Sequence, residues 1–139
     1  MLIVDTSGIV AAVNSGDDAH PAVRAAIEQE TGRLLVTDFV LAEADYLIAK
    51  YLGREAEEAF LGDVLAGGYT RETVHASDLA RGLELIRRYG DHDIGITDAT
   101  TVAVAERLNV RRILTLDRRH FATFKFRDSK PFILVPKSS

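Results

Sequence analysis

Short runs of consecutive apolar residues alternate along this chain with longer segments whose apolar residues recur every three or four positions. The runs predict buried β-strands, and the longer segments predict amphipathic α-helices. The predicted strands are residues 2–4, 33–37, 69–74, 112–116 and 132–135. The predicted helices are residues 7–14, 20–30, 54–66, 77–89 and 98–108, with one more that is capped by Asp38 and reaches Tyr51.

Strands that alternate with helices predict an α/β fold, in which a central, mostly parallel sheet is covered by helices on both faces. Crossover connections between parallel strands are almost always right-handed, so the carboxyl ends of these strands are expected to share one edge of the sheet. Residues 90–97 are expected to form a loop, and the segment after residue 116 is expected to form a turn.

Composition and charge narrow the class of protein. The 139 residues contain no repeat or linker-like tract, which predicts a single domain over residues 1–139. No apolar run approaches the roughly 20 residues that span a bilayer, so no membrane association is expected. The absence of cysteine excludes disulfides and thiolate metal sites and suits a cytoplasmic protein. At a net charge of −4, nucleic-acid binding requires a local basic patch.

Two predicted strands each lead into an aspartate. Asp5 follows residues 2–4, and Asp117 follows residues 112–116. Ligands of open α/β sheets bind outside this edge, so both carboxylates are candidate site residues. Asp5 could instead cap the next helix, although Thr6 and Ser7 could do so without a charge. Asp117 could instead be a turn residue or the partner of a neighbouring arginine.

Glu43 occupies an unusual position in its predicted helix. It lies three residues after Val40 and four before Leu47, which places it on the apolar stripe of the helix. A carboxylate that faces the core is rare unless it is paired or bound to a metal. Glu43 is therefore predicted to be a site residue, with a salt bridge to an arginine as the alternative.

Asp98 is the fourth candidate acid. It begins a predicted helix, where the helix dipole favours a carboxylate, and it shares a face with the apolar Val102. The nearby Asp91 and Asp93 remain alternatives to Asp98 as the functional acid. Three or four carboxylates gathered in one place must take up protons or bind a cation. Oxygen ligands favour Mg²⁺ or Mn²⁺, which predicts metal-assisted hydrolysis of a phosphodiester.

Basic residues surround the strand that leads to Asp117. They form a candidate phosphate-binding patch, with solvated side chains or a protein-docking surface as the alternatives. The patch comprises Arg111, Arg112, Arg118, Arg119 and His120. Arg118 and Arg119 leave the strand at the predicted catalytic edge. The aromatic residues Tyr46 and Tyr51 are interpreted as helix packing residues rather than as base-stacking platforms.

Four motifs together resemble those of the PIN-domain nucleases, and in particular those of the VapC toxins of bacterial toxin–antitoxin systems. They are Val4-Asp5-Thr6-Ser7, the sequence VLAEADYL at residues 40–47, IGITDA at residues 94–99 and TLDRRHF at residues 115–121. Their order and the length of the chain are those of the family, and the resemblance extends over essentially the whole sequence.

The resemblance implies a PIN-like three-layer α/β/α domain whose acidic site consists of Asp5, Glu43, Asp98 and Asp117. Asp5 and Asp98 are then the primary ligands of Mg²⁺ or Mn²⁺. Glu43 and Asp117 support these ligands or hold a second ion, and Thr115 and Thr6 support the site. The resemblance also implies cleavage of RNA, such as a tRNA or rRNA, inhibition by a cognate VapB-type antitoxin, and a homodimer. An RNA-processing nuclease and a non-catalytic PIN-fold binding module are the alternative functions.

Overall fold

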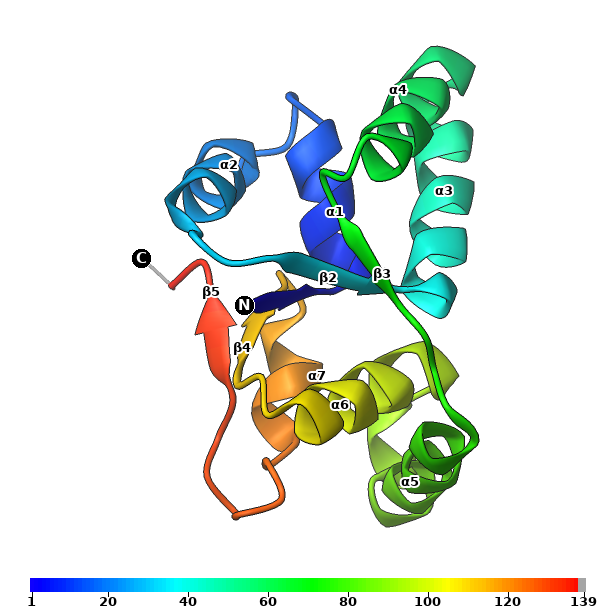
Figure 1. Ribbon diagram of the computed structural model, residues 1–139, viewed down its shortest axis with the longest axis vertical. Helices are drawn as coiled ribbons and strands as arrows, with labels where there is room; N and C mark the ends of the chain where they lie inside the picture. The colour runs from blue at the N-terminus through cyan, green and yellow to red at the C-terminus, as the bar shows by residue number, and fades with distance from the viewer. Residues whose placement is uncertain (138–139) are drawn as a thin grey trace.

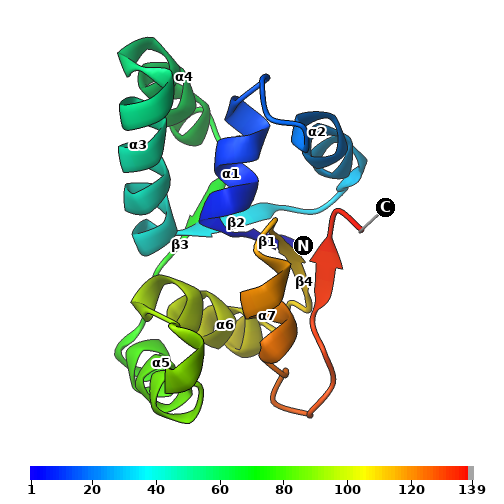
Figure 2. The same ribbon diagram turned by 180° about the vertical axis from the view of Figure 1, so that it is seen from behind.

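The computed structural model describes residues 1–137 and has a five-stranded parallel sheet between two layers of helices (Figures 1 and 2). The strands are β1 (Leu2–Val4), β2 (Leu34–Thr37), β3 (Thr70–Glu72), β4 (Arg112–Leu114) and β5 (Ile133–Val135). They lie in the order β3-β2-β1-β4-β5, and every neighbouring pair is parallel. The predicted three-layer α/β/α class is therefore confirmed.

Among residues 1–137, seven α-helices and one 3₁₀ turn connect the strands. They are α1 (Thr6–Val13), α2 (His20–Gln29), α3 (Asp38–Leu52), α4 (Arg54–Leu65), α5 (Ala76–Arg88), η1 (Gly90–His92), α6 (Ile96–Leu108) and α7 (Arg118–Thr123). The turn expected after residue 116 is in fact α7, for which Asp117 is the N-cap and accepts a hydrogen bond from the His120 backbone N–H. Six residues are too few for helical periodicity to show in a sequence.

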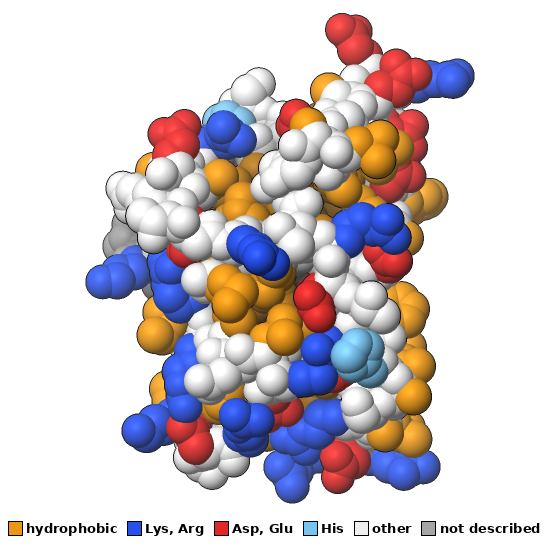
Figure 3. All heavy atoms as spheres, in the orientation of Figure 1, with side chains coloured by type: hydrophobic (Ala, Val, Ile, Leu, Met, Phe, Trp, Pro, Cys, Tyr) orange, Lys and Arg blue, Asp and Glu red, His pale blue; other side chains and the backbone are white. Residues whose placement is uncertain are grey.

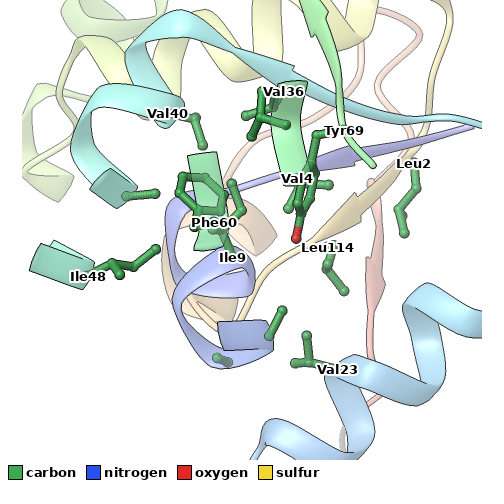
Figure 4. Packing of buried hydrophobic residues seen from close by; sticks show 14 of the residues in the cluster. Leu2, Val4, Ile9, Val23, Val36, Val40, Ile48, Phe60, Tyr69 and Leu114 are labelled. Atoms are coloured by element: carbon green, nitrogen blue, oxygen red, sulfur yellow. The ribbon is translucent and has the colours of Figure 1, made fainter. Parts of the chain in front are cut away.

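The alternation of side chains along the strands divides the core between the two faces of the sheet. Leu2 and Val4 of β1 pack with α1–α4 on one face (Figure 4), whereas Ile3 belongs to the core shared with α5–α7 on the other face. In β4, Leu114 and Ile113 divide in the same way. Strands that are buried on both faces read as continuous apolar runs, which is the pattern seen in the sequence.

The connections of the chain reverse direction at the middle of the sheet. From β1 the chain proceeds to β2 and β3 on one side, and it then crosses to β4 and β5 on the other side. A crevice at the carboxyl ends of the strands forms at such a switch point, here between β1 and β4. Asp5 and Asp117 follow these two strands. Within residues 1–137, no helix has both the length and the apolar character needed to cross a membrane.

Candidate metal and nucleic-acid site

All four predicted acids line one cleft of about 620 Å³ at the switch point of the sheet. Asp5 and Asp117 enter it from the ends of β1 and β4, Glu43 from α3, and Asp98 from the first turn of α6. The alternatives Asp91 and Asp93 do not line this cleft. A fifth carboxylate, that of Asp17 in the loop after α1, also lines it. The sequence gives Asp17 only a turn signal, so its place in the cleft was not predicted.

Asp5 is held by two hydroxyl groups. Its Oδ2 accepts hydrogen bonds from Ser7 Oγ at 3.0 Å and from Thr115 Oγ1 at 2.8 Å. The hydroxyl oxygens themselves accept backbone N–H groups, Ser7 from Leu116 and Thr115 from Asp117, both at 2.9 Å. This network joins the end of β1 to the end of β4 and fixes the orientation of the Asp5 carboxylate.

The helix-capping interpretation of Asp5 is wrong, because its side chain makes no cap hydrogen bond although it occupies the N-cap position of α1. Thr6 and Ser7 do not cap α1 either. Ser7 is bonded to Asp5, and Thr6 Oγ1 is buried without a hydrogen-bond partner within the described part of the chain. Burial raises the pKa of Asp5, and the hydrogen bonds from Thr115 and Ser7 oppose that increase. A cation beside Asp5 would stabilise its ionised form in the same direction.

Asp98 and Asp117 are bridged by His120. The Nδ1 atom of His120 lies 3.1 Å from Asp98 Oδ2 and 2.9 Å from Asp117 Oδ2. Burial, and then the charge of Asp5, raise the pKa of Asp98 to about 6, while the charge of His120 opposes that increase. The sequence placed His120 only in the basic patch. Its spacing of three residues from Asp117 would have indicated the contact had α7 been predicted.

The donor set fits a hard divalent cation. Asp98, Asp117 and His120 each offer one ligand atom, and these atoms lie within 4.8 Å of one another. Asp5 and Asp98 are close enough for the charge of Asp5 to raise the pKa of Asp98. Gathered carboxylates that resist ionisation are stabilised by a bound cation, and two carboxylates with one imidazole suit a divalent metal ion.

The sequence pattern predicted that Glu43 faces the core, and this prediction is wrong. Its side chain is exposed at the cleft, although Val40 of the same helix is buried. The pattern is misleading because Leu47, the other apolar neighbour that defined the stripe, also lines the cleft. The alternative of a salt bridge to arginine is wrong as well, because Glu43 has no ion-pair partner in residues 1–137. Glu43 therefore presents an unpaired carboxylate to the cleft.

The basic patch predicted from the sequence is divided in space. Arg112 lies at the start of β4, at the edge opposite Asp117, and is bonded to Glu30. Arg111 is paired with Asp128 there. A strand places its first and last residues at opposite edges, so neither arginine lines the cleft. On the face shown in Figure 3, Lys and Arg side chains gather over the half of the molecule that contains α5 and α6.

Arg118 and Arg119 do start at the catalytic edge. Arg118 donates a hydrogen bond to the Pro136 carbonyl at 2.9 Å, and Arg119 is exposed.

Tyr46 and Tyr51 are not packing residues, because they are 61% and 68% exposed on α3. Smaller apolar residues complete the core of this helix, so the two rings remain in solvent, with the Lys50 Nζ atom 5.7 Å from the Tyr46 ring centroid and 5.2 Å from that of Tyr51.

Replacement of Thr115 by valine tests the hydroxyl network. Thr115→Val keeps the shape but removes the bond to Asp5 Oδ2 and leaves the Asp117 N–H without its acceptor. We expect the free energy of unfolding to fall by about 1–2 kcal/mol, and the catalytic activity of the cleft to fall about tenfold because Asp5 is no longer fixed. Thr70→Val, on strand β3, is the control. Equal activity of Thr115→Val and wild type would show that the hydroxyl does not orient Asp5.

Comparison with known proteins agrees with this geometry. The family model of the PIN domain matches residues 2–126. Ribonuclease VapC26 of Mycobacterium tuberculosis is 35% identical over 135 residues, which cover 97% of this chain and 100% of that protein. The crystal structure of M. tuberculosis VapC20, a toxin that cleaves the sarcin–ricin loop, superimposes with a TM-score of 0.78 at 24% identity, covering 84% of this chain and 90% of that one.

A second crystal structure has the same fold. It is VapBC2 of Rickettsia felis bound to a promoter DNA fragment, with a TM-score of 0.66 at 19% identity and coverage of 96% of both chains. The match to the family model, the identity to VapC26 and the cleft of gathered carboxylates agree with one another. The chain therefore belongs to the PIN-domain family and, within it, to the VapC ribonucleases.

Proposed function

We propose that this protein is a metal-dependent endoribonuclease and the toxin of a toxin–antitoxin pair. The observation that carries the proposal is the convergence of Asp5, Glu43, Asp98 and Asp117 on one cleft, where burial raises the pKa of Asp5 and Asp98. Such a site gains its full charge only with a cation, and its oxygen donors suit Mg²⁺ or Mn²⁺. The identity to ribonuclease VapC26 supports RNA as the substrate.

Asp5 and Asp98 would hold the ion, and Asp117 would assist from the end of β4. When bound, Mg²⁺ lowers the pKa of a coordinated water and neutralises charge on a phosphate. The remaining tasks belong to the chain itself. Ser7 and Thr115 keep Asp5 in a single orientation, and the unpaired Glu43, which lines the cleft, would accept a proton from the attacking water. Arg118 would contact an RNA phosphate beside the cleft, and Arg119 would contact the RNA next to it.

Hydrolysis by an activated water leaves a 5′-phosphate and a 3′-hydroxyl. The test is incubation of purified protein with total cellular RNA in Mg²⁺, in chelator, and with Asp5→Asn as the inactive control. Discrete fragments that require both the metal and Asp5, with 5′-phosphate ends, are the expected result. Ends with a 2′,3′-cyclic phosphate would show attack by the RNA's own 2′-hydroxyl and would exclude this mechanism. Sequencing of the ends would show whether the target is a tRNA or an rRNA.

The proposed partners are a VapB-type antitoxin and a second copy of the chain, and the proposed location is the cytoplasm, where the RNA lies. The R. felis neighbour is a VapBC complex, which supports the first partner. Large apolar side chains are exposed on α3 and α5, and they offer surface for such contacts: Tyr46, Leu79 and Leu83. Co-purification with the product of an adjacent small gene, and light scattering of the free protein, test the two partners separately.

A further inference from the structure

A second hollow adjoins the metal cleft. It has a volume of about 530 Å³ and is lined by Asp91, His92, Asp93, Arg119, His120 and Thr123. His120 lines both the cleft and the hollow, and it contacts Asp98 and Asp117 in the cleft. The hollow therefore continues the cleft on the far side of His120. The hollow is therefore open to the part of a ligand that extends past His120 from the cleft.

The two walls of this hollow carry opposite charges that do not meet. Asp91 and Asp93 stand on the η1 side, and Arg119 stands on α7. No salt bridge within 4.0 Å joins them anywhere in residues 1–137, although buried carboxylates such as Asp78 and Glu106 are paired with arginines at 2.8–3.1 Å. The carboxylates and the guanidinium thus keep unused hydrogen-bonding capacity in a hollow of about 530 Å³.

We propose that this hollow binds a guanine base next to the scissile phosphate; the proposal rests on the ribonuclease function above. Guanine presents N–H donors at N1 and N2 on one edge and acceptors at O6 and N7 on another. Arginine pairs with O6 and N7, and a carboxylate accepts from the amino edge. Adenine, cytosine and uracil each lack one of these paired edges, so guanine alone uses both walls fully.

The shape and position of the hollow are consistent with a base from single-stranded RNA. Its volume lies within the range of small-molecule sites. The imidazole rings of His92 and His120 offer flat faces against which a base can stack. A base enters such a hollow only if it can leave its helix, which restricts the substrate to loops, bulges and ends. The hollow thereby selects both the base and the RNA conformation.

The test uses a short unstructured RNA that contains the mapped cleavage site, with the adjoining guanine replaced in turn by inosine, 7-deazaguanine or adenine. Inosine lacks the N2 amino group, and 7-deazaguanine lacks the N7 acceptor. We expect kcat/KM of the wild-type protein to fall about tenfold for each of the first two, and further for adenine.

Variants assign each effect to one wall. Arg119→Ala is expected to remove the penalty for 7-deazaguanine and to keep the penalty for inosine. Asp93→Asn is expected to do the converse, and because Asp93 has a φ of 55°, a conformation that asparagine also adopts readily, the loop should be preserved. Arg33→Ala and Glu55→Gln change exposed residues away from the hollow, and they should keep the wild-type discrimination.

The possible outcomes separate this inference from the proposed function. Cleavage at equal rates with every base, or penalties that persist unchanged in Arg119→Ala and Asp93→Asn, would overturn the guanine site alone. If folded wild-type protein cleaves no RNA in Mg²⁺, the proposed function fails, and the hollow is tested by NMR titration with guanosine and adenosine monophosphates. Shifts at Arg119 and Asp93 with the guanine nucleotide only would support the site, and equal shifts or none would refute it.

Discussion

Asp98→Asn is expected to make the metal-free protein more stable and to abolish RNA cleavage. The carboxylate is 19% exposed, and its pKa of about 6 shows that the fold disfavours its charge. Each pKa unit corresponds to about 1.4 kcal/mol, so neutral asparagine should raise the free energy of unfolding at pH 7.5 by about 1–3 kcal/mol. Loss of the proposed metal ligand would remove several kcal/mol of transition-state stabilisation, or at least about 10³-fold in rate.

The sign of the pH dependence follows from the raised pKa. Neutral Asp98 is favoured in the folded state, so its stabilising contribution is complete below pH 3.8 and is lost as the pH rises through about 6. Asp5, whose pKa is also raised, contributes in the same direction. The stability difference between Asp98→Asn and wild type should therefore be small at pH 4 and should reach its full value above pH 7. Urea unfolding in chelator at several pH values measures it.

Activity should follow the opposite course. In the proposed site the ionised form of Asp98 holds the ion, so at subsaturating Mg²⁺ the cleavage rate of wild type should fall about tenfold per pH unit below about pH 6. Saturating Mg²⁺ should move this decline to lower pH, because the cation favours the ionised carboxylate.

Mg²⁺ should raise the melting temperature of wild type but not that of Asp98→Asn. Asp18→Asn, in an exposed turn, is the control, and a less stable Asp98→Asn would contradict the interpretation.

The sequence predicted the parts of this molecule that depend on local patterns. All five strands were predicted, four of them from apolar runs and β3 from the polar segment around Thr70–Glu72, and the acids after two of the strands gave Asp5 and Asp117. The order of the strands could not be predicted. It depends on pairing between segments that are distant in the sequence, and the periodicity of apolar residues gives no information about such pairing. That Asp5 and Asp117 lie in the same cleft could still be predicted, because parallel strands present their carboxyl ends at one edge of the sheet.

The errors in the predicted basic patch have a common physical origin: closeness in sequence was taken for closeness in space. Arg111 and Arg112 adjoin the strand of Asp117 but lie at its other end, where they are paired with Asp128 and Glu30. His120 is the converse case. It contacts two acids of the site because α7, too short to be predicted, turns its imidazole back toward Asp117.

Gly8 should be the position where a single added methyl group does the most damage. A Cβ there would lie 2.7 Å from the Leu114 carbonyl oxygen and 3.0 Å from Leu114 Cγ, so α1 and β4 would have to separate. The same carbonyl accepts the Asp5 N–H at 2.9 Å, which places the clash directly beneath the hydroxyl network of the site. Crowding of a packed backbone costs about 1–3 kcal/mol or more.

Gly8→Ala is therefore expected to lower the free energy of unfolding by about 2–3 kcal/mol. At temperatures where the variant stays folded, the rate of RNA cleavage should fall about 10²-fold, because Asp5 is displaced from Asp117. Gly62→Ala is the matched control. Gly62 also lies within a helix but meets no atom within 4 Å, so alanine there should stabilise the protein by about 0.5–1 kcal/mol through helix propensity. If the change in the free energy of unfolding has opposite signs for Gly8→Ala and Gly62→Ala, contact with β4, and not helix propensity, determines the residue at position 8. If both variants were more stable than wild type, α1 would not be seated against Leu114 as described, and the geometry of the Asp5 network would have to be revised.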